Sequence, residues 1–260
     1  MWLSDKQLHT YAEQGYLVVS DLFNESEVTL LRDECAALFE EDHPANFCER
    51  ESGVVRTAMA IHNRSELFAR LTRHPRLVEP AMQILGDESL YVQQVKVNAK
   101  VAFSGEIWQW HYDFATHHNE DGVPEPLALN VHVFLDEVTE FNGPLWFIPR
   151  SHQHGAVRAA LDTQTTSYPL WCVDRDVVTD LIDDGGLVSI TGKPGTVLIF
   201  GDCLVHGSPA NMSPFNRRIY SVILNPTSNA YTLDQRPDYQ HHRDLTPVVP
   251  LADSCLSDVR

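Results

Sequence analysis

The stretch Leu90-Tyr-Val-Gln-Gln-Val-Lys-Val-Asn-Ala-Lys-Val101 is rich in valine and alternates between apolar and polar residues over much of its length. A period of two predicts a β-strand, and valine favours one. Moving outward, similar segments predict further strands at 107–113, 127–135, 195–200 and 219–225. The last two-thirds of the chain is therefore expected to be mainly β.

The first third of the chain has a helical pattern instead. Ser4 with Gln7, and Asn24 with Glu27, form capping boxes that predict the start of two helices. The first helix is expected to end at Gly15, and a third is expected at 75–85. The stretch 158–184 is less regular and predicts one short helix near Asp176.

No linker-like segment separates the helical part from the β part. We therefore expect residues 1–260 to form a single domain, in which a helix-rich N-terminal third packs on a β-barrel. The turn signal Asn142-Gly-Pro144 is expected to join two strands of that barrel.

Charge and composition narrow the classes of function. The 260 residues include 19 Lys and Arg against 36 Asp and Glu, a net charge of −17, which argues against binding to nucleic acid or an anionic membrane. No apolar stretch is long enough to span a membrane, and the first residues do not resemble a secretory signal. The 5 cysteines form no CxxC pair, which favours a reducing compartment. We expect a cytoplasmic protein with a small-molecule partner, and its oligomeric state is left open.

The segment Trp110-His111-Tyr112-Asp113 holds the first candidate metal ligands. On a strand, residues two apart project to the same face, so His111 and Asp113 would offer one imidazole nitrogen and one carboxylate oxygen together. A second imidazole follows the Pro194-Gly195 turn and a short apolar strand, at His206. Two histidines and one carboxylate on one face of a metal are typical of non-haem Fe(II) oxygenases.

Arg217 follows His206 by eleven residues and is expected on the next strand. Its guanidinium can bind a dicarboxylic cosubstrate with two parallel hydrogen bonds. A surface ion pair is the alternative for an isolated arginine. Arg218 alternates to the other face of the strand, so only one of the two can point inward.

Other histidines and aromatic residues have plainer interpretations. His152 and His154 lie in a loop, and His241 and His242 lie in a polar segment where a solvated surface is expected. His117 follows the proposed ligand pair and is expected to line the site. Trp110 is a candidate wall of the substrate pocket, although core packing is the commoner role of tryptophan.

Taken together, these segments resemble the phytanoyl-CoA-dioxygenase-like family of Fe(II)/2-oxoglutarate oxygenases. The resemblance is closest to its bacterial branch that acts on small amino acids, which includes trans-proline 4-hydroxylase, leucine 5-hydroxylase and ectoine hydroxylase. It covers nearly the whole chain and rests on an ordered set of segments: 14–19, 73–86, 90–98, 110–113, 119–122, 136–145, 206–217 and 236–239.

The resemblance implies a double-stranded β-helix, the jelly-roll or cupin-like barrel, with iron inside one end. His111, Asp113 and His206 match the iron ligands, and Arg217 matches the arginine that binds the distal carboxylate of 2-oxoglutarate. Ser208 and Asn98 match positions that help to hold cosubstrate or substrate, and Gln94 matches a glutamine of the substrate pocket. The implied cofactors are Fe(II), 2-oxoglutarate and O2, with ascorbate expected to help in assays.

Three residues depart from the family pattern near the expected substrate cavity. Tyr112 stands where the free-amino-acid hydroxylases have Gln, His117 stands where ectoine hydroxylase has Trp, and Arg150 stands where the family usually has Gly. All three are candidates for the substrate pocket, and the substrate is therefore expected to differ from proline, leucine and ectoine. Arg150 suits either a substrate carboxylate or a surface ion pair.

The expected activity is hydroxylation of an unactivated C–H bond in a small amino acid or a derivative of one, giving succinate and CO2. The main alternative is natural product biosynthesis, with hydroxylation, desaturation or cyclisation of a larger scaffold. A non-catalytic cupin-like binding protein is a further alternative, but it would not need Arg217 beside a complete ligand set. A zinc hydrolase with the same ligands is a minor option.

Overall fold

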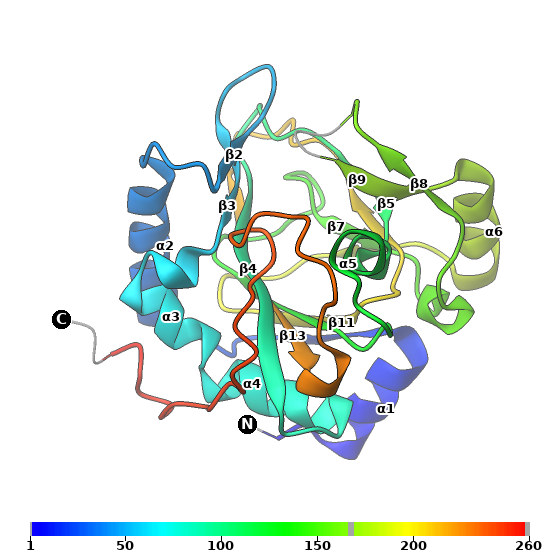
Figure 1. The fold of residues 1–260 in the computed structure, drawn as a ribbon. Coiled ribbons are helices and arrows are strands. Elements are labelled where there is room, and N and C mark those ends of the chain that lie inside the picture. The colour runs from blue at the N-terminus through cyan, green and yellow to red at the C-terminus, as the bar shows by residue number, and fades with distance from the viewer. Residues whose placement is uncertain (1, 166–168, 258–260) are drawn as a thin grey trace.

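The computed structural model describes residues 2–165 and 169–257, and in it two antiparallel sheets face each other across a shared interior (Figure 1). The major sheet has seven strands in the order β1-β11-β6-β13-β4-β3-β2, and the minor sheet has six in the order β10-β7-β12-β5-β9-β8. Strands distant in sequence are neighbours in both sheets, as in a jelly roll. The expected double-stranded β-helix with flanking helices is confirmed.

The strands of the major sheet are β1 (Tyr16–Val19), β2 (Asn46–Cys48), β3 (Val55–Met59), β4 (Leu90–Lys100), β6 (Leu129–Phe134), β11 (Val197–Gly201) and β13 (Arg217–Pro226). Those of the minor sheet are β5 (Trp108–His111), β7 (Leu145–Phe147), β8 (Ala159–Asp162), β9 (Leu170–Val173), β10 (Val188–Ile190) and β12 (His206–Ser208).

The α-helices are α1 (Asp5–Gln14), α2 (Glu25–Phe39), α3 (Glu66–Thr72), α4 (Pro75–Leu85), α5 (Asp113–Asp121) and α6 (Arg175–Gly185). Short 3-10 turns lie at Ile61–Asn63, Ser151–His154 and Thr227–Asn229. Among the described residues, no helix is long and apolar enough to cross a membrane.

The two faces of the major sheet differ in chemistry because residues along each strand alternate between them. On β4, Val95 and Val97 pack outward in a core shared with α2, α3 and α4. Lys96 and Asn98 point the other way and line an internal cavity. The outer face thus supplies most of the hydrophobic core, and the inner face is left free for polar chemistry.

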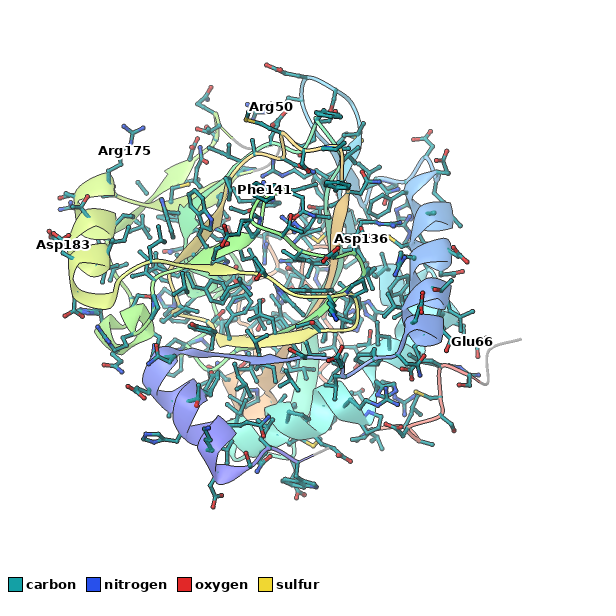
Figure 2. The ribbon with its side chains drawn as sticks, turned by 180° about the vertical axis from the view of Figure 1, so that it is seen from behind. Arg50, Glu66, Asp136, Phe141, Arg175 and Asp183 are labelled. Carbon is teal, nitrogen blue, oxygen red and sulfur yellow. The ribbon has the colours of Figure 1, made fainter. Side chains whose placement is uncertain are left out.

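Aromatic side chains fill the barrel interior beside this cavity. Phe134, Phe147 and Phe200 form a buried cluster there, and Phe200 also lines the cavity wall. Charged side chains gather at the outside instead: Arg175 and Asp183 on α6 are exposed and lie at the periphery (Figure 2). The cavity is therefore a polar space inside a tightly packed interior.

Both capping boxes are present, at Ser4 and Asn24, and α4 has the expected bounds with Gly86 as its left-handed C-cap. The expected strand at 107–113 is wrong at its end, because β5 stops at His111 and Asp113 begins α5. Asp113 lies in the first turn of α5, where the partial positive charge of a helix N-terminus favours a carboxylate.

Candidate metal centre and cosubstrate pocket

His111 and His206 are directly opposite each other on β5 and β12 of the minor sheet. Their ring centroids are 4.1 Å apart. The Nδ1 of His111 lies 2.6 Å from the carbonyl oxygen of Gln109, and the Nδ1 of His206 lies 2.9 Å from that of Leu204. Because Nδ1–H donates to a carbonyl in each case, the Nε2 lone pair of each ring is free to bind a metal.

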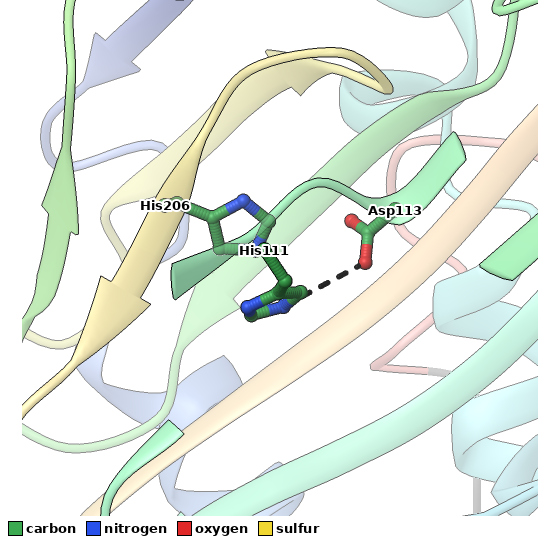
Figure 3. A group of neighbouring side chains, drawn as sticks. All are labelled: His111, Asp113 and His206. Carbon is green, nitrogen blue, oxygen red and sulfur yellow. Dashed lines mark ion pairs between the residues drawn. The ribbon is translucent and has the colours of Figure 1, made fainter. Parts of the chain in front are cut away.

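Asp113 completes a set of three possible ligands (Figure 3). Its Oδ1 lies 4.0 Å from the Nε2 of His111, and its Oδ2 accepts a hydrogen bond of 2.9 Å from the Nδ2 of Asn130 on β6. One ligand atom from each of His111, Asp113 and His206 lies within 4.8 Å of the others. Within residues 2–165 and 169–257, no other group of His, Cys, Asp and Glu meets this condition.

The protonation states suit a metal cation. Burial, reinforced by the nearby His206, lowers the pKa of His111 to about 3, so its ring is neutral. Burial alone would raise the pKa of Asp113, but His206 and Lys96 hold it well below the usual range, so its carboxylate is ionised. Two imidazoles and one carboxylate are the ligand set of non-haem Fe(II) sites, and the residues present fit this metal.

Arg217 is a fully buried cation in the same cavity. Its Nε donates to the carbonyl of Gly143 at 3.1 Å, and its Nη2 donates to the Oγ of Ser208 at 3.3 Å. Among the described residues it forms no ion pair with a carboxylate, and burial lowers its pKa to about 9. A buried, unpaired guanidinium is costly, so this end of the cavity requires an anion.

Gly143, in the expected turn before β7, lets the main chain pack closely against Lys100 beside Arg217. Its φ of 78° favours glycine, and a Cβ there would lie 2.4 Å from the Cδ of Lys100. The buried amine of Lys100 donates to the carbonyls of Pro209, at 2.6 Å, and Glu106. Sequence reasoning missed Lys100, although it lies on β4 in register with Arg217. Lys100 does not line the cavity, and burial lowers the pKa of its amine well below the usual range, so Arg217 is the group at this end that suits a carboxylate.

Of the other expected site residues, Asn98 lines the cavity and accepts a hydrogen bond of 2.9 Å from Thr57. Gln94 contacts the cavity through Lys96, whose amine donates to the Oε1 of Gln94. Sequence reasoning also missed three polar lining residues: Lys96, Asn130 and His132. The alternation that pointed to 94 and 98 could have found Lys96, which lies on the same face.

Four expected pocket residues do not line this cavity. Trp110 faces a second groove, where its ring lies 6.4 Å from that of Trp146. The Tyr112 hydroxyl donates to the carbonyl of Val157. His117 pairs with the buried Asp202 at 2.9 Å, and Arg150 donates to the carbonyl of Asp184. Because the strand ends at His111, Tyr112 and His117 do not continue along the cavity wall, although Asp113 still lines it.

The expectation of a solvated surface at 241 is wrong. His241 is 1% exposed, and its Nδ1 lies 3.3 Å from the Oδ2 of Asp121 at the end of α5. Arg236 donates to the same carboxylate. These contacts hold residues 230–243, which we call the C-terminal strap, against α5. The strap also reaches β4, where the carbonyl of Gln240 accepts a hydrogen bond of 2.6 Å from the Nε2 of Gln94.

Comparison with known proteins agrees with this geometry. L-proline trans-4-hydroxylase of Streptomyces griseoviridis is 34% identical over 251 residues, which cover 93% of each chain. Ectoine dioxygenase of Sphingopyxis alaskensis is 35% identical over 87% of this chain and 77% of its own. The crystal structure of EctD from S. alaskensis with 2-oxoglutarate and 5-hydroxyectoine has a TM-score of 0.84 and 33% identity, covering 96% of this chain and 87% of that one.

The phytanoyl-CoA dioxygenase (PhyH) family matches residues 11–219, a span that includes all three candidate metal ligands, Ser208 and Arg217. The ligand set, the buried arginine and the two-sheet barrel thus occur together in one chain that this family describes over most of its length. The chain belongs to the phytanoyl-CoA dioxygenase family of non-haem iron, 2-oxoglutarate-dependent dioxygenases.

Proposed function

We propose that this dioxygenase hydroxylates an unactivated C–H bond of a small amino acid or an amino-acid derivative, with conversion of 2-oxoglutarate to succinate and CO2. The observation that carries the proposal is the placement of a two-histidine, one-carboxylate set and a buried, unpaired arginine in one cavity. The proline and ectoine enzymes among its relatives support the substrate class.

In this proposal His111, Asp113 and His206 hold Fe(II), and Arg217 with Ser208 binds the distal carboxylate of 2-oxoglutarate. When bound, the iron and 2-oxoglutarate supply the activation of O2 and the oxidation of the C–H bond. The protein orients these groups: Asn130 fixes the Asp113 carboxylate through its 2.9 Å hydrogen bond, and the carbonyls of Gln109 and Leu204 fix the imidazole rings.

Asp113 favours hydroxylation over halogenation, because its carboxylate occupies a metal position that a halide would need. Which C–H bond reacts then depends on how the cavity wall holds the substrate. We further propose that residues 1–260 act as one domain, in the cytoplasm, on a small molecule and without nucleic acid. The acidic balance of the chain supports the last point.

Mass spectrometry of complete reactions tests the proposal. Purified protein is incubated with Fe(II), ascorbate, 2-oxoglutarate and a panel of free L-amino acids with their N-acyl and cyclic derivatives, and reactions without 2-oxoglutarate serve as controls. We expect one panel member to gain one oxygen with matching succinate. Succinate without a modified panel member would favour a larger scaffold as substrate, and the absence of both would contradict the proposed activity.

A further inference from the structure

Lys96 is a second basic group on the cavity wall, separate from the basic end at Arg217. It lies opposite Ser221 on β13, four residues along that strand from Arg217, a displacement of about 13 Å at the usual rise of a strand. The cavity wall includes both residues, with the metal ligands His111, Asp113 and His206. A single cosubstrate carboxylate held at Arg217 therefore does not also pair with Lys96.

A chain of hydrogen bonds orients the Lys96 amine. The amine donates to the Oε1 of Gln94, and the Nε2 of Gln94 donates to the carbonyl of Gln240 in the C-terminal strap at 2.6 Å. Both partners of the Gln94 amide are thus specified, so its oxygen faces the lysine. The Lys96 ammonium has three donors, and this arrangement uses one of them.

The charges of the loaded site leave Lys96 without a counter-ion. Asp113 is the one carboxylate on the described part of the cavity wall, and a bound metal would engage it. The other buried acid near the cavity, Asp202, is paired with His117. Fe(II) and Arg217 together balance Asp113 and the two carboxylates of 2-oxoglutarate. No acid on the described cavity wall then remains to pair with Lys96, and burial lowers the pKa of its amine, so a charged Lys96 requires a further anion.

Two further buried polar groups lie in the same row of the sheet. Ser221 is opposite both Lys96 on β4 and His132 on β6. Among the described atoms, neither the Oγ of Ser221 nor either ring nitrogen of His132 has a hydrogen-bond partner. Buried polar groups without partners are rare in folded proteins. This row therefore has unused hydrogen-bonding capacity beside the unbalanced cation.

We propose that Lys96 binds a carboxylate of the substrate and is the residue that selects for acids at this site. The proposal rests on the proposed hydroxylase function and deepens it. The substrate carboxylate takes a free N–H of the Lys96 ammonium, and the Lys96–Gln94–Gln240 chain transmits the position of the C-terminal strap to the substrate. Lys96 is then a specificity-determining residue of the enzyme, distinct from the cosubstrate anchor at Arg217.

Equilibrium binding under anaerobic conditions tests this without turnover. The Fe(II)- and 2-oxoglutarate-loaded protein is titrated calorimetrically with the same panel of free L-amino acids and their N-acyl and cyclic derivatives, each acid paired with its carboxamide. We expect at least one acid to bind at least about 10-fold more tightly than its amide, as for hydrogen bonds to charged groups. Lys96→Met should weaken acid binding by about 10- to 100-fold and leave amide binding unchanged, whereas Lys96→Arg should retain most of the preference.

Lys193→Met makes the same change at an exposed lysine and should have no effect. If no acid binds better than its amide to the wild-type protein, including the case in which none binds, the proposal is overturned. An unchanged preference in Lys96→Met overturns it as well. The visible absorption of Fe(II) chelated by 2-oxoglutarate, recorded in the same samples, reports the proposed function separately. Failure of that signal contradicts the metal and cosubstrate site and not the role of Lys96.

Discussion

The two ends of the cavity are built in different ways. The proposed metal ligands and Arg217 come from β5, β12 and β13 and from the first residue of α5, and their partners are mostly main-chain carbonyls of the barrel. The side around Lys96 and Gln94 is completed by the C-terminal strap. The Asp121 carboxylate holds the strap against α5, together with main-chain hydrogen bonds from Thr232 and Leu233 to the Asp121 carbonyl. The barrel thus fixes the groups proposed to hold iron and cosubstrate, and the strap completes the side proposed for the substrate.

Replacing Asp113, the proposed metal-binding carboxylate, should have the largest effect on activity. Asp113→Ala removes the only charged ligand of the set, so we expect hydroxylation to fall to background and Fe(II) affinity to be lost. Metal content after dialysis, measured by atomic emission together with succinate formation, checks this. Asp180→Ala on the exposed face of α6 is the matched control and should leave both unchanged. Full activity in Asp113→Ala would refute the ligand assignment.

Replacing Arg217, the proposed binding residue for the distal carboxylate of 2-oxoglutarate, should have the second largest effect. Arg217→Met removes the charged hydrogen bonds proposed for 2-oxoglutarate, and we expect its Kd to rise by about 10- to 100-fold. The neighbouring Arg218 faces the other way and pairs with Asp136 at 2.8 Å. Arg218→Met should therefore lower stability but keep 2-oxoglutarate affinity. Equal loss of affinity in the two variants would mean that Arg217 acts only through folding.

Asn130 offers a finer test of the metal end. Its amide orients Asp113 without being a ligand, and removal of such a partner typically weakens a metal site by about 10- to 100-fold. Asn130→Ala should weaken Fe(II) binding within that range, whereas Asn130→Gln should recover part of it if the longer amide still reaches. Titration with Fe(II), followed by absorbance in the presence of 2-oxoglutarate, measures the change. An unaltered Fe(II) affinity would show that Asn130 does not contribute to metal binding.

The strap end should respond in stability and substrate affinity. Hydrogen bonds and charge from His241 and Arg236 lower the pKa of Asp121 to about 2, against the opposing effect of burial. A lowered carboxyl pKa stabilises the folded state above the unfolded value near 4, and this contribution is lost as pH falls toward 2. Asp121→Asn should therefore cost about 2 kcal/mol near neutral pH and progressively less below pH 4, measured by urea unfolding.

In the same variant, binding measurements should distinguish the cosubstrate side of the cavity from the substrate side. In Asp121→Asn, 2-oxoglutarate affinity should stay at the wild-type value while the KM of the substrate rises, since only the strap is loosened. If both affinities changed together, the strap would not be a separate element of the substrate side.

The smallest effect is expected at Arg150. Its guanidinium binds the carbonyl of Asp184 and does not line the cavity, so Arg150→Ala should change kcat/KM by less than about 2-fold. A larger loss, with unchanged unfolding behaviour, would show that the substrate extends to this loop.

Local patterns explain why the barrel was predictable from sequence. Capping boxes at Ser4 and Asn24 and the alternation of β4 depend on neighbouring residues, and each is present in the structure. The family resemblance pointed to His111, Asp113, His206 and Arg217, which the structure brings together in one cavity. Short strands such as β2 and β10 have too few residues for a period to be seen, and sequence analysis missed them.

Contacts between distant segments explain what was missed. His241 is buried because Asp121, 120 positions earlier, lies beside it, and no local pattern reports such a pairing. The switch from strand to helix between His111 and Asp113 places the Tyr112 side chain in a core with α6, away from the cavity. Lys96 was missed for a different reason: its alternation with Gln94 and Asn98 was visible in the sequence, but it was not used.

The most direct test of the central claim is anaerobic equilibrium dialysis of radiolabelled 2-oxoglutarate with and without Fe(II), in wild-type protein, Asp113→Ala and Arg217→Met. We predict that one equivalent binds per wild-type chain, that binding depends on Fe(II), and that either substitution weakens it. Equal binding of 2-oxoglutarate by all three proteins, or binding that ignores the metal, would contradict the assignment of the cavity.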